Sequence, residues 1–246
     1  MCVPMAWADA SPEKWWEYIV RLALLLIIVG IVVFGPQLWT RRVFAQHSAP
    51  RPDYPGTGAE LARHLLDQLD MQHIKVEMTQ QGDHYDPETK AVRLTPDKFD
   101  GKSLTAITVA AHEVGHAIQD HTGYQPFTER TRLVRVAQGA EKLGGVVMMG
   151  IPIAAALAQT PVAGVVVLVA GMATMGISTL VHLVTLPVEW DASFRRAFPV
   201  LQQRNYLSLE DERGARRILT AAALTYVAAS LASMLNLWRW IAFLRR

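Results

Sequence analysis

Long apolar stretches separated by polar, arginine-containing segments dominate the hydropathy pattern of the chain. Four of them could cross a bilayer: 15–39, 136–158, 162–187 and 218–244. A crossing helix needs about 20 mostly apolar residues. The unbroken apolar run of the first stretch, residues 22–34, is shorter, but tryptophans flank it as they flank many membrane helices. The pattern therefore predicts about four transmembrane helices.

Three of these stretches have an alternative interpretation. A signal peptide is the alternative for the first, but Arg41 and Arg42 follow it and no small-residue cleavage site does, which favours an uncleaved anchor. A buried hairpin inside a globular domain is the alternative for the second and third. The absence of charge from Leu143 to Pro187 favours membrane helices there.

The segment 40–135 has the mixed composition of a globular domain. Leucines at helical spacing predict a helix over 58–70. Residues 74–80 and 90–95 have the composition of strands, and the turn-like "GDHYDPET" between them predicts that they pair as a β-hairpin. A second helix is expected over 103–123, with a serine at its start and a glycine at its end.

Composition agrees with a membrane class. Of 246 residues, 51% are hydrophobic and 19% are charged, which is apolar for a protein of ordinary globular type. The formal net charge of +2 is too small to indicate a nucleic-acid partner, and none is expected. The single cysteine, Cys2, excludes an intramolecular disulfide.

The positions of the arginines predict an orientation in the membrane. They follow the first apolar stretch, precede the second and lie between the third and fourth, whereas the turn between the second and third has none. Basic residues collect on the cytoplasmic side of membrane proteins. The segments 40–135 and 188–217 are therefore expected to share the cytoplasmic side.

The candidate chemistry lies in "AAHEVGHAIQD", residues 110–120. On a helix, His112 and His116 face the same way one turn apart, so both imidazoles can bind one tetrahedral Zn²⁺. Glu113 lies about 100° around the helix and can act as general base toward a zinc-activated water. The alternative is a chance placement of these side chains on a surface helix.

Two histidines leave such a site one protein ligand short. Catalytic zinc is often completed by a distant carboxylate, and "LPVEWDASFRRAF" after the third apolar stretch offers Glu189 and Asp191. Glu189 is the first choice, because Pro187 can begin a short helix that presents it one turn in. Asp191 stays open as the alternative ligand, or as a residue that holds a ligand histidine.

Three further features have a functional and a structural interpretation. Tyr226 could donate to an oxyanion, or it could simply bond to a neighbouring helix. His182 lies within the third apolar stretch, where it could be functional or could contact another helix. The backbone at 91–94 could pair with an extended substrate if it formed an exposed edge.

The chain resembles a family of bacterial membrane zinc metallopeptidases, a membrane-embedded gluzincin group. The resemblance rests on "GDHYDPETKAVRLTPD", "AAHEVGHAIQD", "LVTLPVEWDAS" and "GARRILTAAALTYVAA", in this order. It implies zinc ligands at His112, His116 and Glu189, and a site on the cytoplasmic side of the bacterial inner membrane. The chain is also similar to proteases with Glu-x-x-Ala-Asp at the third ligand. Ser193 stands where they have the aspartate, with Asp191 as a possible substitute.

The expected fold is an α+β membrane protein. In it, a small gluzincin-like domain of helix, β-hairpin and HExxH helix is joined to about four transmembrane helices. The expected function is a multi-pass zinc endopeptidase with one Zn²⁺ per chain, which hydrolyses membrane or membrane-proximal polypeptides. Its partners are the polypeptide substrate and the lipid bilayer; the sequence names no partner protein. The alternative is a non-catalytic zinc-containing scaffold or adaptor, and Glu113 favours the enzyme because metal binding alone does not need it.

Overall fold

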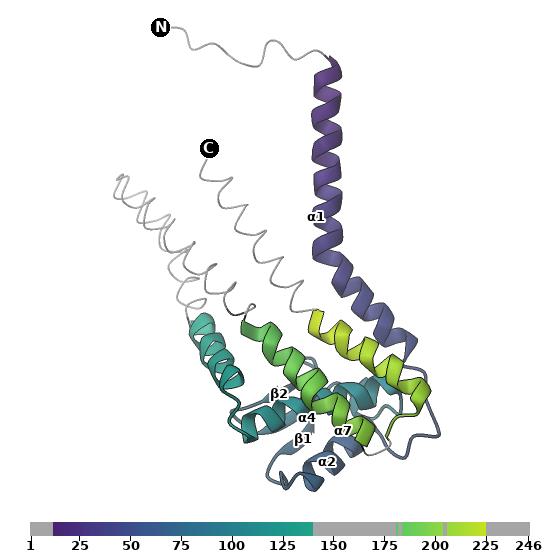
Figure 1. The fold of residues 1–246 in the computed structure, drawn as a ribbon, viewed down its shortest axis with the longest axis vertical. Helices are drawn as coiled ribbons and strands as arrows, with labels where there is room; N and C mark the ends of the chain where they lie inside the picture. The colour runs from purple at the N-terminus through teal and green to yellow at the C-terminus, as the bar shows by residue number, and fades with distance from the viewer. Residues whose placement is uncertain (1–11, 140–180, 182–183, 204–205, 225–246) are drawn as a thin grey trace, which may run out of the picture.

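The computed structural model of the chain describes residues 12–139, 181, 184–203 and 206–224. This part of the chain is mostly helical and contains one three-stranded sheet. Figure 1 shows a long N-terminal helix that leads into a compact group of helices, with the sheet on one side of that group.

Helix α1 (Pro12–Gln46) stands away from the other described elements along most of its length (Figure 1). Its apolar side chains there are exposed. The C-terminal end of the helix joins the core instead. Val43 is buried, and Thr40 Oγ1 donates to the Ala221 carbonyl over 3.0 Å. This contact ties α1 to a segment far away in the sequence.

The prediction of about four transmembrane helices is wrong for the part of the chain that the structure describes. There, none of the helices combines the length and the apolar character that a bilayer crossing requires. The stretch 15–39 falls within α1, but its unbroken apolar run covers about 20 Å at 1.5 Å per residue, against a hydrocarbon core of about 30 Å. The predictions for 136–158, 162–187 and 218–244 fall largely outside the described residues.

Helix α2 (Gly58–Gln68) begins with a capping box. The Thr57 hydroxyl accepts from the Glu60 backbone N–H, and the Glu60 carboxylate accepts from the Thr57 N–H over 2.8 Å. Two backbone donors at the start of the helix are thereby satisfied. The prediction of a helix here is confirmed. Its buried face, which packs against α4 (Leu104–His121), carries Ala59, Leu61, Ala62, Leu65 and Leu66.

The sheet has the order β1-β3-β2, with β1 at Lys75–Met78, β2 at His84–Asp86 and β3 at Ala91–Leu94. The predicted hairpin of the first and last of these strands is wrong, because β1 and β3 run parallel. The segment expected to be their turn contains β2, which pairs antiparallel with β3. Since β3 is central, its backbone is not the free edge that substrate pairing would need.

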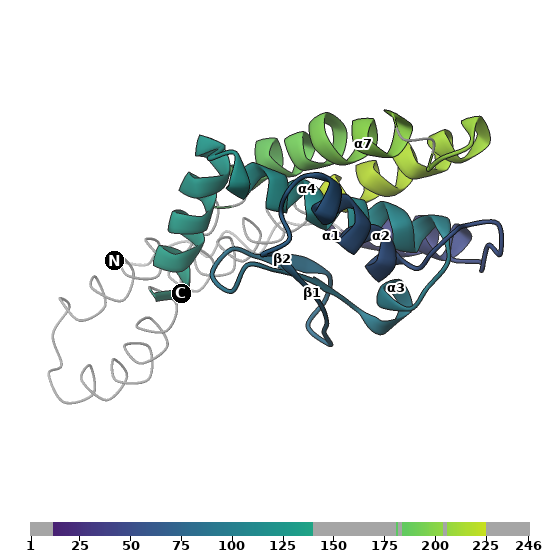
Figure 2. The same ribbon diagram turned by 90° about the horizontal axis from the view of Figure 1, so that it is seen from below.

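Helix α4 (Leu104–His121) is the central element and is buried along most of its length. The Ser103 hydroxyl caps it by accepting from the Ala106 N–H over 3.1 Å, and Gly123 follows its end with a φ of +63°. Both ends are close to the sequence prediction, which is confirmed. One side of α4 packs against α2, and another packs against the helical segment that follows residue 190 (Figure 2).

That segment is a π-helix, η1 (Asp191–Ala197), which continues a helix at 184–190 and leads into α7 (Phe198–Gln203). Gly115 of α4 faces it so closely that an added Cβ would lie 2.6 Å from the Ala192 carbonyl oxygen. A glycine is therefore required where α4 and η1 touch. Insertions of this wide helical type are often found at functional sites.

A further helix is described at 209–224, and an ion pair fixes its start. Asp211 is buried and accepts from Arg51 Nη1 over 2.9 Å and from the Ser208 hydroxyl over 2.7 Å. The same arginine also pairs with the exposed carboxylate of Asp53. Asp211 thus links the loop after α1 to the helix 209–224.

We expect Asp211→Ala to lower the free energy of unfolding by about 1–2 kcal/mol, because it removes charged hydrogen bonds to a partly buried group. Asp53→Ala is the matched control on the same arginine and should cost less than about 0.5 kcal/mol, since that carboxylate is exposed to solvent. Chemical denaturation of the two variants measures both values. Equal losses would contradict the anchoring role of Asp211.

Candidate metal centre

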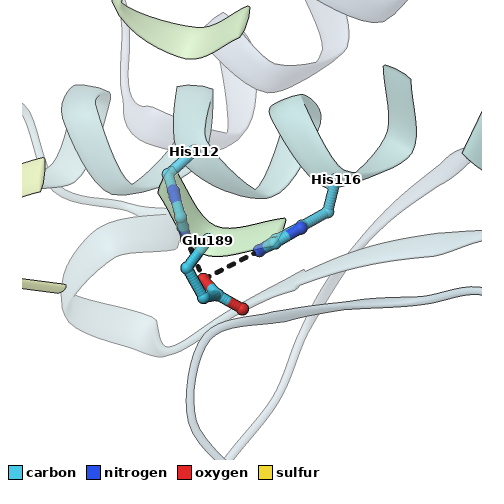
Figure 3. A group of neighbouring side chains, drawn as sticks. All are labelled: His112, His116 and Glu189. Carbon is cyan, nitrogen blue, oxygen red and sulfur yellow. Dashed lines mark hydrogen bonds and ion pairs between the residues drawn. The ribbon is translucent and has the colours of Figure 1, made fainter. Parts of the chain in front are cut away.

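The central turns of α4 bring two imidazoles together. His112 and His116 are both buried, and their ring centroids lie 4.8 Å apart at a steep angle. Their spacing of four residues places them on one face of the helix. The face that they share points toward the helix 184–190 (Figure 3).

Glu189 from that helix completes the group. Its side chain is fully buried, and Glu189 Oε2 lies 3.2 Å from Nε2 of His112 and 3.2 Å from Nε2 of His116. The three ligand atoms all lie within 4.8 Å of one another (Figure 3). Three groups able to bind a metal thus converge on one point inside the protein.

These distances fit a zinc ion. Zinc binds histidine nitrogen and carboxylate oxygen at about 2.0–2.1 Å in tetrahedral geometry, so neighbouring ligand atoms should lie roughly 3.3–3.4 Å apart. The two nitrogen-to-oxygen distances of 3.2 Å are close to that edge length. Two imidazoles and one carboxylate are also a donor set that catalytic zinc uses.

A glutamine orients the second histidine. Gln119 Nε2 donates to the Val188 carbonyl and to Asp191 Oδ2, each over 2.8 Å, which fixes the amide so that its Oε1 is turned toward His116. That oxygen accepts from His116 Nδ1 over 3.0 Å. With the proton on Nδ1, the lone pair on Nε2 faces Glu189 and is free for a metal.

Ser193 contacts Nδ1 of the first histidine, His112, as Gln119 contacts Nδ1 of the second. Its Oγ lies 3.1 Å from His112 Nδ1 and can accept a hydrogen bond from the Nδ1–H, which again leaves Nε2 for a metal. Asp191 does not belong to the converging group. It accepts from Gln119 and from Arg196 Nε, and so acts on His116 through the glutamine. Ser193 therefore contacts a histidine directly, whereas Asp191 contacts the glutamine that orients the other histidine.

Arg130 is a neighbour of the site that the sequence did not indicate. Its Nη1 donates to Glu189 Oε1 over 2.6 Å. It comes from the helix 125–139, and no spacing or motif connects it with Glu189. Gln119 was also missed, although its position three residues after His116 on the same helix is a signal that could have found it.

The electrostatics of the group favour a charged carboxylate. Burial opposes ionisation, but the two nearby histidines hold the pKa of Glu189 well below its ordinary value. Burial also lowers the pKa of His112, yet the bond to Glu189 and the charge of Glu113 outweigh this and raise it. The Glu189 carboxylate and the His112 imidazole thus each favour the charged form of the other.

Glu113 faces a different space. Burial raises its pKa, and the two histidines partly offset that rise. Together with His112 it lines a cavity of about 150 Å³. The other residues around this cavity come from α1, the residue before β2, α4 and the helix 209–224, and are Thr40, Phe44, Asp83, Val109, Ile218, Leu219 and Ala222. Its walls are mostly apolar and include two acids, Asp83 and Glu113.

Two residues singled out from the sequence, Tyr226 and His182, lie outside the described residues, so their interpretation stays a prediction. His84 begins β2, and its Nδ1 lies 2.8 Å from the Gly82 carbonyl.

Comparisons with known proteins agree with the geometry. The model of a family described as "Putative neutral zinc metallopeptidase" matches residues 22–245. A protein of Bacillus subtilis named "Putative membrane protease YugP" is 32% identical over 224 residues, which cover 89% of this chain and 96% of that protein. No solved structure matches the chain.

We expect Gln119→Ala to weaken zinc binding about 10- to 100-fold, because His116 loses the acceptor that holds its proton on Nδ1. Competition with a chromophoric chelator measures the affinity. Gln125→Ala, an exposed glutamine just beyond α4, is the control and should bind zinc like the wild type. An unchanged zinc affinity in Gln119→Ala would mean that the amide does not orient the histidine.

Proposed function

The chain belongs to the neutral zinc metallopeptidase family, and we propose that it is a zinc-dependent endopeptidase with one zinc per chain. His112, His116 and Glu189 would hold the metal, and Glu113 would act as general base. The observation that carries the proposal is the buried convergence of two imidazoles and one carboxylate beside a further buried glutamate.

When bound, zinc supplies a Lewis acid that polarises the scissile carbonyl and activates water for attack. The chain supplies the proton handling. Glu113 takes the proton of the attacking water and delivers it to the leaving amine. Its raised pKa suits both steps, because a general base works best when its pKa lies near the working pH. Gln119 and Ser193 keep the two imidazoles in the orientation that metal binding needs.

The cavity beside Glu113 provides a place for one side chain of the substrate. A cavity of about 150 Å³ is large enough for a benzene-sized group. Because its walls are mostly apolar, we propose that it accepts an aliphatic or small aromatic side chain next to the scissile bond. A larger cavity of about 310 Å³, near Tyr54 and His64, includes none of the three ligand residues and has no part in this proposal.

Membrane association is part of the proposal and is supported by the name of the relative, a membrane protease. The substrates would then be polypeptides at or near the membrane. The cytoplasmic placement of the site depends on the positions of the arginines alone and stays a prediction.

A non-catalytic zinc scaffold is the alternative function. A structural zinc site is usually closed by four protein ligands, whereas a catalytic one has three and an open position. Among the described residues, three groups converge here. Glu113 lines a cavity next to them and is not part of the converging group. Both features favour the enzyme.

Two substitutions should separate metal binding from proton transfer. Glu113→Gln retains all three ligands, so the protein should hold zinc while peptide hydrolysis falls at least about a hundredfold. Glu189→Ala removes a ligand and should release much of the zinc together with the activity. Metal analysis and cleavage of a fluorogenic peptide measure the two effects.

The same pair of variants can refute the proposal. Hydrolysis at the wild-type rate by Glu113→Gln would refute the peptidase mechanism, and full zinc retention by Glu189→Ala would refute the ligand assignment. Circular dichroism shows whether Glu189→Ala is folded.

Ala222→Leu should reduce the space beside Glu113 and change the specificity. For peptides with leucine or phenylalanine at the cleavage site, kcat/KM should fall by roughly 10-fold or more. This is the effect expected when a hydrophobic pocket loses room for one to two methylene groups. Peptides with alanine there should be cleaved at nearly the wild-type rate. A uniform loss for all peptides would show that this cavity does not bind the substrate side chain.

A further inference from the structure

We propose that Arg130 is a positioning residue that makes Glu189 bind the metal through one oxygen only, so that one coordination position stays open for the reaction. The inference rests on the proposed zinc peptidase function. It concerns a residue outside the HEVGH motif and outside the segment around Glu189.

The two oxygens of Glu189 have different neighbours. Oε2 lies 3.2 Å from each of the two histidine Nε2 atoms, and Oε1 lies 2.6 Å from Arg130 Nη1. A short, charge-assisted bond of this kind is among the stronger hydrogen bonds in proteins. Oε1 is therefore engaged by the arginine, while Oε2 is turned toward the imidazoles.

Arg130 is itself held in place by an aromatic ring. Its guanidinium carbon lies 5.3 Å from the ring centroid of Phe127, one turn earlier on the same helix. The ring of Phe127 is 2% exposed and lies 6.0 Å from the ring of His116. One buried aromatic side chain therefore contacts both a proposed ligand and the arginine that orients another ligand.

Burial makes the arginine necessary. The Glu189 side chain has no exposure to water, so without Arg130 its Oε1 would lose its charged partner. A buried carboxylate oxygen without a partner carries a large free-energy cost. The nearest remaining cation would be the metal, and a two-oxygen contact with it would take the position that catalytic zinc leaves open.

Infrared difference spectroscopy tests this directly, because carboxylates bound through one or two oxygens differ in the separation of their two C–O stretches. We compare zinc-loaded with zinc-free protein for the wild type, Arg130→Met, Arg130→Lys and Arg132→Met. The last is the matched control, an exposed arginine two residues further along the same helix.

The wild type, Arg130→Lys and Arg132→Met should show the wide separation of one-oxygen binding. Arg130→Met should show the narrow separation of two-oxygen binding, and its peptidase activity should fall about 10- to 100-fold. A purely structural role of Arg130 would lower the activity without changing the stretch separation.

A narrow separation in the wild type would overturn the proposal, and this result does not depend on whether any variant folds. A wide separation in folded, zinc-loaded Arg130→Met would overturn it as well. Absence of zinc from the wild type would instead refute the proposed function itself. The two failures are therefore distinguishable.

Discussion

The burial of the Glu189 carboxylate is the constraint on which the site depends. A carboxylate without exposure to water is stable only when both oxygens have charged or polar partners. Here one oxygen faces two imidazoles and the other faces a guanidinium. Three helices must therefore meet around one side chain. The close contact of Gly115 with Ala192 lets two of them approach far enough for this to happen.

The elements that local sequence determines were predictable. The leucines and the capping residues that define α2 lie close together in the sequence. The same is true of the two histidines of α4. The proposed third ligand is different, because Glu189 lies 73 positions after His116 in the sequence. Local sequence offers two acids there, Glu189 and Asp191. Both are buried, and only the packing of the helices decides that Glu189 faces the two histidines whereas Asp191 faces Gln119.

The remaining features of the fold and the site depend on contacts between residues far apart in the sequence, which no local pattern indicates. A strand pair separated by a turn-like segment suggests a hairpin, but the segment is itself a strand and takes the antiparallel place beside β3. Arg130 and Glu189 are 59 residues apart, and neither has a neighbour in sequence that points to the other. Within the described residues the first apolar stretch led to a further error, because its unbroken apolar run is shorter than a membrane crossing requires.

The distance in sequence between the two halves of the site also has a consequence for biosynthesis. A ribosome adds roughly 5–20 residues per second, so the 73 residues between His116 and Glu189 take about 4–15 s to make. During that interval the growing chain carries both histidines and Glu113 but lacks Glu189. The buried group of two imidazoles and one carboxylate therefore cannot assemble on the growing chain until residue 189 has been made.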